Sequence, residues 1–207
     1  MTHPAATGEP TRDRLISSAR ELFAERGYQR APVQEVLDRT NVSRGALYHH
    51  FASKDKLFEA VFEPVEEQIA ATLVDAARGA QTGKQALQAG CAAWFELTQD
   101  HAIRRIALID APTVMGWARW RAIDARHGFG LLKAALQWEA DAGRLDPDLV
   151  DSYAHLLLAA LMEFGLQIAN ADQPATARRH AQQTIDTLID CLLPGDRPRR
   201  HRRRDHD

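Results

Sequence analysis

Cysteine is scarce in this chain of 207 residues: only Cys91 and Cys191 occur, far apart in the sequence. Two isolated cysteines do not form a disulfide framework, so we expect a protein of a reducing compartment, the cytoplasm. We find no apolar run long enough to cross a bilayer, and no charged-then-apolar signal at the N-terminus. We therefore expect neither a membrane span nor a secretion signal.

Motifs for catalysis and for metal binding are absent as well. The sequence has no nucleophile elbow, no phosphate-binding loop and no cluster of metal ligands. His49 and His50 are adjacent, but neighbours on a helix point about 100° apart, and no cysteine or acid lies at ligand spacing from them. We expect no enzyme activity, no metal and no cofactor. Four polar residues of the second half are too scattered to form a catalytic set: Asp110, His127, His155 and Glu163.

Helical periodicity is what the sequence does contain. From Arg12 to Arg26 apolar residues recur every three or four positions, and Gly27 follows as a helix stop. Pro32 fits the first turn of a second helix, and the turn at Thr40 and Asn41 leads to a third helix capped by Ser43. Helices separated by so few residues cross steeply. This is the geometry of a helix-turn-helix, which seats its second helix in the DNA major groove.

The third predicted helix, within residues 42–51, has a polar face suited to DNA. An arginine, a tyrosine and a histidine offer contacts to base edges and phosphates, and a glycine lets the backbone approach the duplex closely. His50 is different, because it precedes the apolar Phe51, and we assign it a structural role in packing against the first helix. The residues expected to point outward are Arg44, Gly45, Ala46, Tyr48 and His49.

Residues 11–57 carry a dense set of motifs, which include Leu22-Phe23-Ala24-Glu25, Gly27-Tyr28, Gly45-Ala46-Leu47-Tyr48, His50-Phe51 and Lys54-Asp55. With these motifs the segment closely resembles the TetR family of transcriptional repressors. The resemblance implies an all-α fold, in which an N-terminal three-helix helix-turn-helix domain binds DNA and a second helical domain binds a ligand and dimerises. It implies contacts to bases and phosphates from eight candidate DNA-binding residues: Gln34, Ser43, Arg44, Gly45, Ala46, Tyr48, His49 and Lys54.

We divide the chain into a disordered N-terminal tail (1–10), the helix-turn-helix domain (11–57), the helical ligand-binding and dimerisation domain (58–193) and an Arg-rich disordered tail (194–207). The net charge is −2, and the last fourteen residues hold six arginines and three aspartates, which leaves 20 basic and 25 acidic side chains, or −5, before them. Bulk charge therefore does not drive DNA binding, and placed residues on one face must supply it. We interpret the Arg-rich tail as solvated or disordered rather than as a DNA contact.

Residues 55–80 predict one long connecting helix with an apolar inner stripe. Pro64 interrupts this pattern, and a proline there removes one backbone hydrogen bond and kinks the helix. Two interpretations stay open. The kink is either a hinge between the two halves of the chain or a bend that packing tolerates.

All four tryptophans fall between residues 94 and 138. Pro112 and Gly116 break the helical run 103–120, and helix ends and kinks open space that side chains line. We expect a cavity here for a small lipophilic or aromatic effector; the alternative is that these aromatic residues form an ordinary core. The candidate ligand-binding residues are Trp94, Asp110, Met115, Trp117, Trp120, His127, Phe129, Glu163 and Phe164.

The last two predicted helices have broad apolar faces, over residues 149–168 and 177–192, and these exceed what one small core absorbs. Paired with their symmetry mates they would form a four-helix bundle in a homodimer, with two reading heads ~34 Å apart and hence a palindromic operator. We predict a ligand-responsive, sequence-specific transcriptional regulator, a repressor released from double-stranded operator DNA by a small molecule. The alternative is a small-molecule carrier or an enzyme that uses the aromatic cavity.

Overall fold

The computed structural model describes residues 10–194, so the two predicted tails, apart from Pro10 and Pro194, lie outside the described residues. Within this range the chain is all α, as predicted, and contains no strand. Two short elements differ from α-helices, since η1 is a π-helix and η2 a 3-10 helix. The elements are α1 (Thr11–Arg30), α2 (Val33–Thr40), α3 (Arg44–His50), α4 (Lys54–Ala76), α5 (Gly83–Leu97), α6 (His101–Ile103), η1 (Arg104–Asp110), α7 (Ala111–Asp124), α8 (Gly128–Asp141), η2 (Pro147–Leu149), α9 (Val150–Asn170) and α10 (Pro174–Leu192).

Local signals in the sequence mark a break in α1, the end of α2 and the start of α3. Gly27 breaks the helical path of α1 with a φ of 73°, a conformation that favours glycine. Asn41 closes α2 in the left-handed region with a φ of 52°. The hydroxyl of Ser43 accepts a hydrogen bond from the backbone amide of Ala46 at 3.2 Å, which confirms the predicted cap of α3. The helix-turn-helix therefore follows from short-range chemistry.

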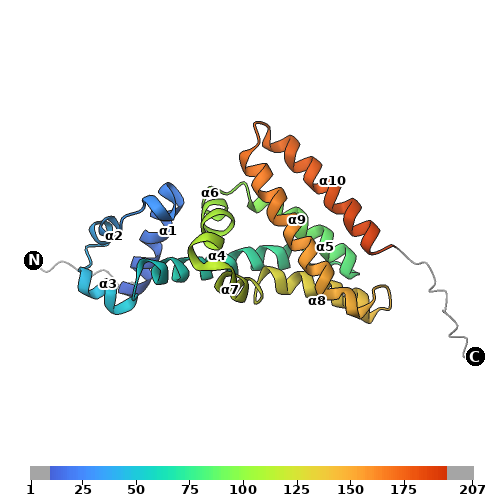
Figure 1. Cartoon of the computed structure of the whole chain (residues 1–207), viewed down its shortest axis with the longest axis horizontal. Helices are drawn as coiled ribbons and strands as arrows, with labels where there is room; N and C mark the ends of the chain where they lie inside the picture. Colours follow the sequence, from blue (N-terminus) through green and yellow to red (C-terminus); the bar gives the residue numbers. More distant parts are fainter. Residues whose placement is uncertain (1–9, 195–207) are drawn as a thin grey trace, which may run out of the picture.

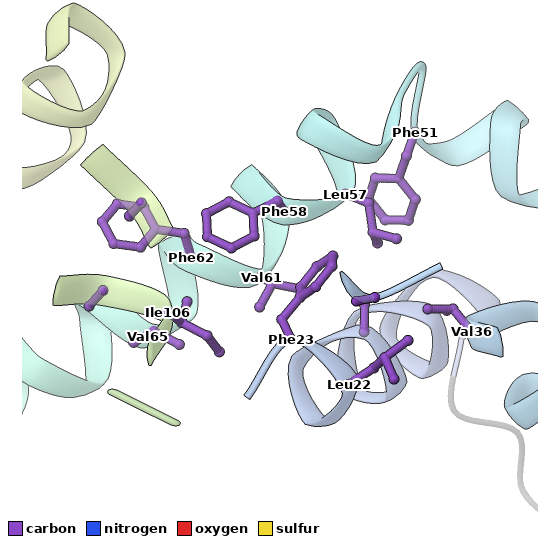
Figure 2. Packing of buried hydrophobic residues seen from close by; sticks show 14 of the residues in the cluster. Leu22, Phe23, Val36, Phe51, Leu57, Phe58, Val61, Phe62, Val65 and Ile106 are labelled. Carbon is purple, nitrogen blue, oxygen red and sulfur yellow. The ribbon is translucent and has the colours of Figure 1, made fainter. Parts of the chain in front are cut away.

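One apolar core joins the helix-turn-helix to the middle of the molecule. Figure 2 shows side chains of α1 and α2 meeting those of α4, and Ile106 of η1 packing beside them. The predicted domain boundary at residue 57 falls inside α4, and the core continues across it. No flexible linker separates α1–α3, which we call the head, from the other described helices. A movement of η1 or α4 would therefore be transmitted directly to the head. The labelled core residues are Leu22, Phe23, Val36, Phe51, Leu57, Phe58, Val61, Phe62, Val65 and Ile106.

Helix α4 runs between the helix-turn-helix at one end of the elongated molecule and α5 and α8 at the other (Figure 1). It is one continuous helix through Pro64, so the predicted interruption does not end the helix there. The proline ring is exposed. Two ion pairs bind the turn of α4 before it: Arg119 Nε of α7 donates to Glu59 at 2.8 Å, and Arg126, which follows α7, binds Glu63 at 2.6 Å. Whether Pro64 acts as a hinge stays a prediction.

A second core holds α5, α8, α9 and α10 together. Helix α9 is only partly covered by it. The segment Pro147–Asn170 is long and apolar enough to cross a membrane by length and composition alone, with a mean hydropathy of 1.4. On that criterion the expectation of no such segment was wrong. Core helices of non-membrane proteins share this length and composition. In this helix 28% of the apolar window is buried, which leaves a face of α9 uncovered.

Candidate functional site

Residues from α2 and α3 form one exposed surface at the end of the molecule, which we call the reading face: Gln34, Arg44, Gly45, Tyr48 and His49. All five residues are exposed, Tyr48 by 44%. The guanidinium of Arg44 donates to the Gln34 side-chain oxygen at 2.8 Å, so the two helices are linked across this face. Gln34 in turn donates to Asp38 at 2.9 Å. The structure thus brings together the residues that were predicted from the sequence to contact bases, and Ala46 lies half-buried behind them.

Gly45 is not required by the fold. A Cβ built on it would have no atom within 4 Å, and its φ lies outside the left-handed region. Glycine inside a helix costs stability relative to alanine, about 1 kcal/mol. A position that is open, helical and still glycine fits a surface on which something outside the chain comes close to the backbone.

Lys54, predicted to meet a phosphate, is engaged inside the protein. Its ammonium donates to the backbone oxygen of Tyr28 at 2.5 Å and lies 4.2 Å from the centre of the Tyr28 ring. Burial lowers the pKa of Lys54, opposed by the charges of Asp55 and Asp110. The Tyr28 hydroxyl donates to Asp55, and burial is the main reason why the pKa of Tyr28 is raised. The hydrogen bond to Tyr28 uses one of the three N–H donors of the ammonium and ties Lys54 to the end of α1.

The structural role predicted for His50 is wrong. His50 is exposed, and its ring contacts His49 and Phe51 rather than α1. Phe51, 4% exposed, occupies the inner position instead, and the Arg12 guanidinium lies 5.6 Å from the centre of its ring.

Residues 10–194 contain no cluster of three or more potential ligands for a metal.

A cavity of about 370 Å³, the central cavity below, lies among α4, α5, α7, α8 and α9. Trp94 of α5 and Trp120 of α7 line it, as expected, and Trp138 of α8 adds a third indole. The indole N–H of Trp94 donates to the backbone oxygen of Leu161 at 3.2 Å, which fixes that ring. The volume suits a small organic molecule. Apolar side chains make up most of the remaining wall, among them Ile69, Leu73, Leu87, Leu131, Leu158 and Met162.

The other seven predicted ligand-binding residues lie away from the central cavity. Trp117 is 69% exposed and packs beside Trp120 on the outside of α7. Met115 packs against the first core, and Phe129 stacks on His155. His127, which directly precedes α8, does not line the cavity either.

Helix geometry accounts for the two mispredicted residues of α9. Leu158, Leu161 and Met162 turn toward the cavity, and a position one residue further on a helix points about 100° away. Glu163 is accordingly exposed and accepts a hydrogen bond from Gln167, and Phe164 packs edge-on against Phe95. The apolar pattern of α9 was too broad to reveal which of its faces lines the cavity.

Two acidic side chains that sequence reasoning missed line the central cavity, Glu66 and Asp124. Glu66 is 6% exposed; burial, and after it the negative charge of Asp124, raises its pKa to about 8. Burial also raises the pKa of Asp124, although its ion pair with Arg121 at 2.9 Å and a hydrogen bond from the Phe129 amide act in the opposite direction. A signal for Glu66 did exist, because it occupies the inner stripe of α4 between Phe62 and Ile69.

Asp110, predicted to orient a ligand, instead joins the head to the body of the molecule. Its carboxylate accepts hydrogen bonds from the backbone amide of Tyr28 at 2.7 Å and from Arg105 Nε at 3.2 Å. The Arg105 guanidinium lies directly against Gly27, where any Cβ would collide with it. The same π-helix places Ala107 on the wall of the central cavity. One short element thus contacts the central cavity and α1, the helix on which α2 and α3 pack.

Comparison with known proteins identifies the chain. The family described as "Bacterial regulatory proteins, tetR family" matches residues 15–61, and the one described as "Tetracyclin repressor-like, C-terminal domain" matches residues 84–192, about half of the chain. The transcriptional repressor AcnR of Corynebacterium efficiens is 30% identical over 76% of this chain and 82% of its own length. The chain belongs to the TetR family.

Other relatives of this TetR-family regulator match over different extents. The transcriptional activator FasR of Mycolicibacterium smegmatis is 34% identical, but the match covers 42% of this chain and 40% of FasR. A solved TetR-family transcriptional regulator from Pectobacterium atrosepticum superimposes with a TM-score of 0.76 and 27% identity, and covers 94% of this chain and all of the other. The fold of the whole chain is therefore that of the family, while FasR is similar over two fifths of its own length.

Proposed function

We propose that this TetR-family regulator is a repressor, which binds a palindromic operator as a homodimer and leaves it when a small lipophilic or aromatic molecule occupies the central cavity. The observation that carries the proposal is the arrangement of two sites on helices that share one continuous apolar core. An exposed reading face lies at one end, an apolar cavity lies in the other half, and η1 contacts both parts. We further propose that the protein acts in the cytoplasm.

For DNA binding, the reading face supplies the donors that a major groove accepts. Arginine pairs with guanine and glutamine with adenine in bidentate contacts, so Arg44 and Gln34 are proposed to read bases. Tyr48 and His49 are proposed to bind phosphates, which position the protein without carrying sequence information. Ser43 and Lys54 are proposed to support the reading face indirectly. Ser43 caps α3, and Lys54 binds the backbone oxygen of Tyr28 in α1.

For the central cavity we propose binding rather than catalysis. Its three chemically active side chains are Glu66, Asp124 and Cys91. Burial, together with the charge of Asp186, raises the pKa of the Cys91 thiol to about 12, so the thiolate that would act as a nucleophile is scarce at neutral pH. Trp94 and Trp120 stay in the proposed ligand-binding set. Trp138 and Glu66 replace the seven residues that lie elsewhere.

Release from DNA follows from linkage between the two sites. Suppose that a ligand binds better to the position of η1 in which the head binds DNA poorly. The ligand then weakens DNA binding by the coupling free energy between the two sites, typically ~1–3 kcal/mol. Ala107 of η1 touches the cavity, and Asp110 at the end of η1 holds the amide of Tyr28. A π-helix is often found at functional sites, which supports η1 as the element that moves.

For the homodimer we propose an interface formed by α9 and α10. Leu156 of α9 is 46% exposed, and Leu188 of α10 is half-buried against the second core. A two-fold axis through this surface would pair the helices in a four-helix bundle and present two reading faces about one turn of DNA apart.

The decisive experiment is a gel-shift assay with the DNA that flanks the coding region, followed by selection of the bound sequence. We expect one tight site with two-fold symmetry, and Arg44→Ala protein should lose the preference for one base pair in each half-site. An unchanged consensus with this variant, or no site in flanking and selected DNA, would refute the proposal.

A further inference from the structure

The central cavity has a one-sided charge pattern. Within the part of the chain that the structure describes, its lining includes two carboxyl groups, Glu66 and Asp124, and no lysine, arginine or histidine. The rest of the wall is apolar or aromatic. An anionic ligand would meet no positive charge here, and burying a charge without a partner is costly. The wall therefore selects against anions.

The two carboxyl groups are not equivalent. Asp124 is paired with Arg121 at 2.9 Å and also accepts a hydrogen bond from the Phe129 amide. Glu66, 6% exposed, has no hydrogen-bond or ion-pair partner among residues 10–194. Its neighbours on the inner stripe of α4 are apolar, and both burial and the negative charge of Asp124 disfavour its ionised form. A buried carboxyl group without a partner, on the wall of an open cavity, is a feature that a ligand can explain.

The aromatic side chains of the wall point to the same chemistry. Trp94, Trp120 and Trp138 come from three different helices and share the cavity with Glu66. Indole rings attract organic cations through the negative potential of their faces, and this attraction grows when water is excluded. A carboxylate and several indoles around one space together favour a cation with an apolar body.

We propose that the effector of this protein is an organic cation of drug-like size, whose protonated or quaternary nitrogen pairs with the carboxylate of Glu66. The inference rests on the proposed function, because it names the class of molecule to which the central cavity responds. The apolar part of the molecule lies between the tryptophans. A volume of about 370 Å³ limits this part to a few fused or linked rings.

Binding of the cation is coupled to loss of a proton from Glu66. In the free protein the carboxyl group has its pKa raised to about 8 and is mostly protonated at neutral pH. A cation pairs with the ionised form, so its affinity must rise between pH 6 and pH 9. The other titratable groups on the wall are Asp124 and Cys91, and Arg121 and His127 act on Asp124. Glu66→Gln isolates the contribution of Glu66 from theirs.

The test compares three naphthalene probes of nearly equal shape. Naphthylmethyl-trimethylammonium carries the cation, neopentylnaphthalene replaces the nitrogen by carbon, and naphthylacetate is an anion. Binding is followed by quenching of tryptophan fluorescence and by the shift in melting temperature. We expect the cation to bind about tenfold or more tightly than the neutral probe, and the anion to bind least.

The matched variants are Glu66→Gln and Glu67→Gln, since Glu67 is the next residue of α4 and is exposed. Glu66→Gln should weaken the cation about tenfold or more, remove the rise of affinity with pH and leave the neutral probe within about threefold. Glu67→Gln should change none of these. A folded Glu66→Gln protein that binds the cation as wild type does overturns the proposal, as does a neutral probe that equals the cation or a cation that fails to bind at millimolar concentration.

Failure of the proposed function is detected separately. The gel-shift assay without any probe asks only whether the chain binds DNA. If it binds none, the regulator itself is refuted, whatever the cavity prefers. If it binds an operator and the cavity takes neutral and cationic probes equally, only the preference for cations is refuted.

Discussion

The carboxylate of Asp110 accepts a hydrogen bond from the backbone amide of Tyr28 at 2.7 Å, across 82 residues of sequence. Asp110 ends the π-helix η1, and Tyr28 follows the break in α1 at Gly27. This contact fixes the head to the element that touches the central cavity. It is one route by which a ligand in the cavity can reorient the reading face.

Asp110→Ala should weaken both the fold and the link between the sites. The change leaves the Tyr28 amide and the Arg105 guanidinium without their partner, and we expect the free energy of unfolding to fall by about 1–3 kcal/mol. Urea denaturation measures this loss. Asp172→Ala, at an exposed position, serves as control and should change stability by less than about 0.5 kcal/mol. Equal stability of the two variants would contradict the link.

Gly45→Ala separates stability from function. Alanine has room at this open helical position, so the variant should be more stable by up to about 1 kcal/mol. Operator affinity should nevertheless fall, because the added methyl group lies where the duplex approaches. Gly90→Ala is the matched control, since Gly90 is also helical and open but lies in α5 on the cavity. Gly45→Ala protein that binds the operator as wild type does would place the DNA elsewhere.

Arg44→Ala should cost about 1–3 kcal/mol of operator binding and relax the preference at one base pair. Arg39→Ala is the control, because Arg39 is an exposed arginine of α2 that is already paired with Glu25 and Glu35. Its removal should leave the consensus unchanged. Sequence selection with both variants checks the assignment. Loss of specificity in Arg39→Ala alone would move the reading surface from α3 to α2.

Local features of the fold could be predicted from the sequence, and contacts between distant segments could not. The stop at Gly27 and the cap at Ser43 depend on neighbouring residues, so the helix-turn-helix was predictable. The bond between Asp110 and Tyr28 depends on how η1 docks on α1, which no periodicity encodes. Glu163 was misplaced for a related reason, because an apolar pattern around most of α9 leaves the rotation of the helix undetermined. Glu66 could be recognised from the sequence as an acid within the inner stripe of α4. That it faces a cavity became clear only from the structure.

Stability of the wild-type protein should fall as pH rises from about 5 to 8. In the folded state the pKa of Glu66 is raised to about 8 by burial and by Asp124, whereas the unfolded chain releases this proton near pH 4.5. Between these values the folded state holds more protons than the unfolded chain, so its stability decreases with pH, by up to about 1.4 kcal/mol per pH unit. Glu66→Gln should remove this contribution.

The measurement is urea denaturation of both proteins at several pH values. The free energy of unfolding of Glu66→Gln minus that of wild type should grow steadily toward pH 8. Glu67→Gln, at the exposed position next to it, should follow the wild-type curve. A constant difference between Glu66→Gln and wild type across this range would show that Glu66 is ionised in the folded protein throughout.

The dimer is tested best on α9 and α10 at side chains that the subunit itself does not need. Ile189 is fully buried in its own subunit, so a charge there would unfold the chain without reporting on assembly. Leu156 and Leu188 are better targets, because they are partly exposed on the outer face. A charge at either position meets its own copy across a two-fold axis, so Leu156→Asp and Leu188→Asp should yield folded monomers.

Sedimentation at micromolar concentration, with circular dichroism to verify folding, distinguishes the outcomes. Val74→Asp provides the control, because Val74 of α4 is 51% exposed but lies outside α9 and α10, and this variant should stay dimeric. Monomers should bind an operator weakly and through single half-sites. Each head then loses its translational and rotational entropy separately, whereas in a dimer the second head binds as part of the same molecule. If wild-type protein sediments as a monomer and still binds the operator tightly, the two heads are not joined through these helices, and the palindromic operator loses its structural basis.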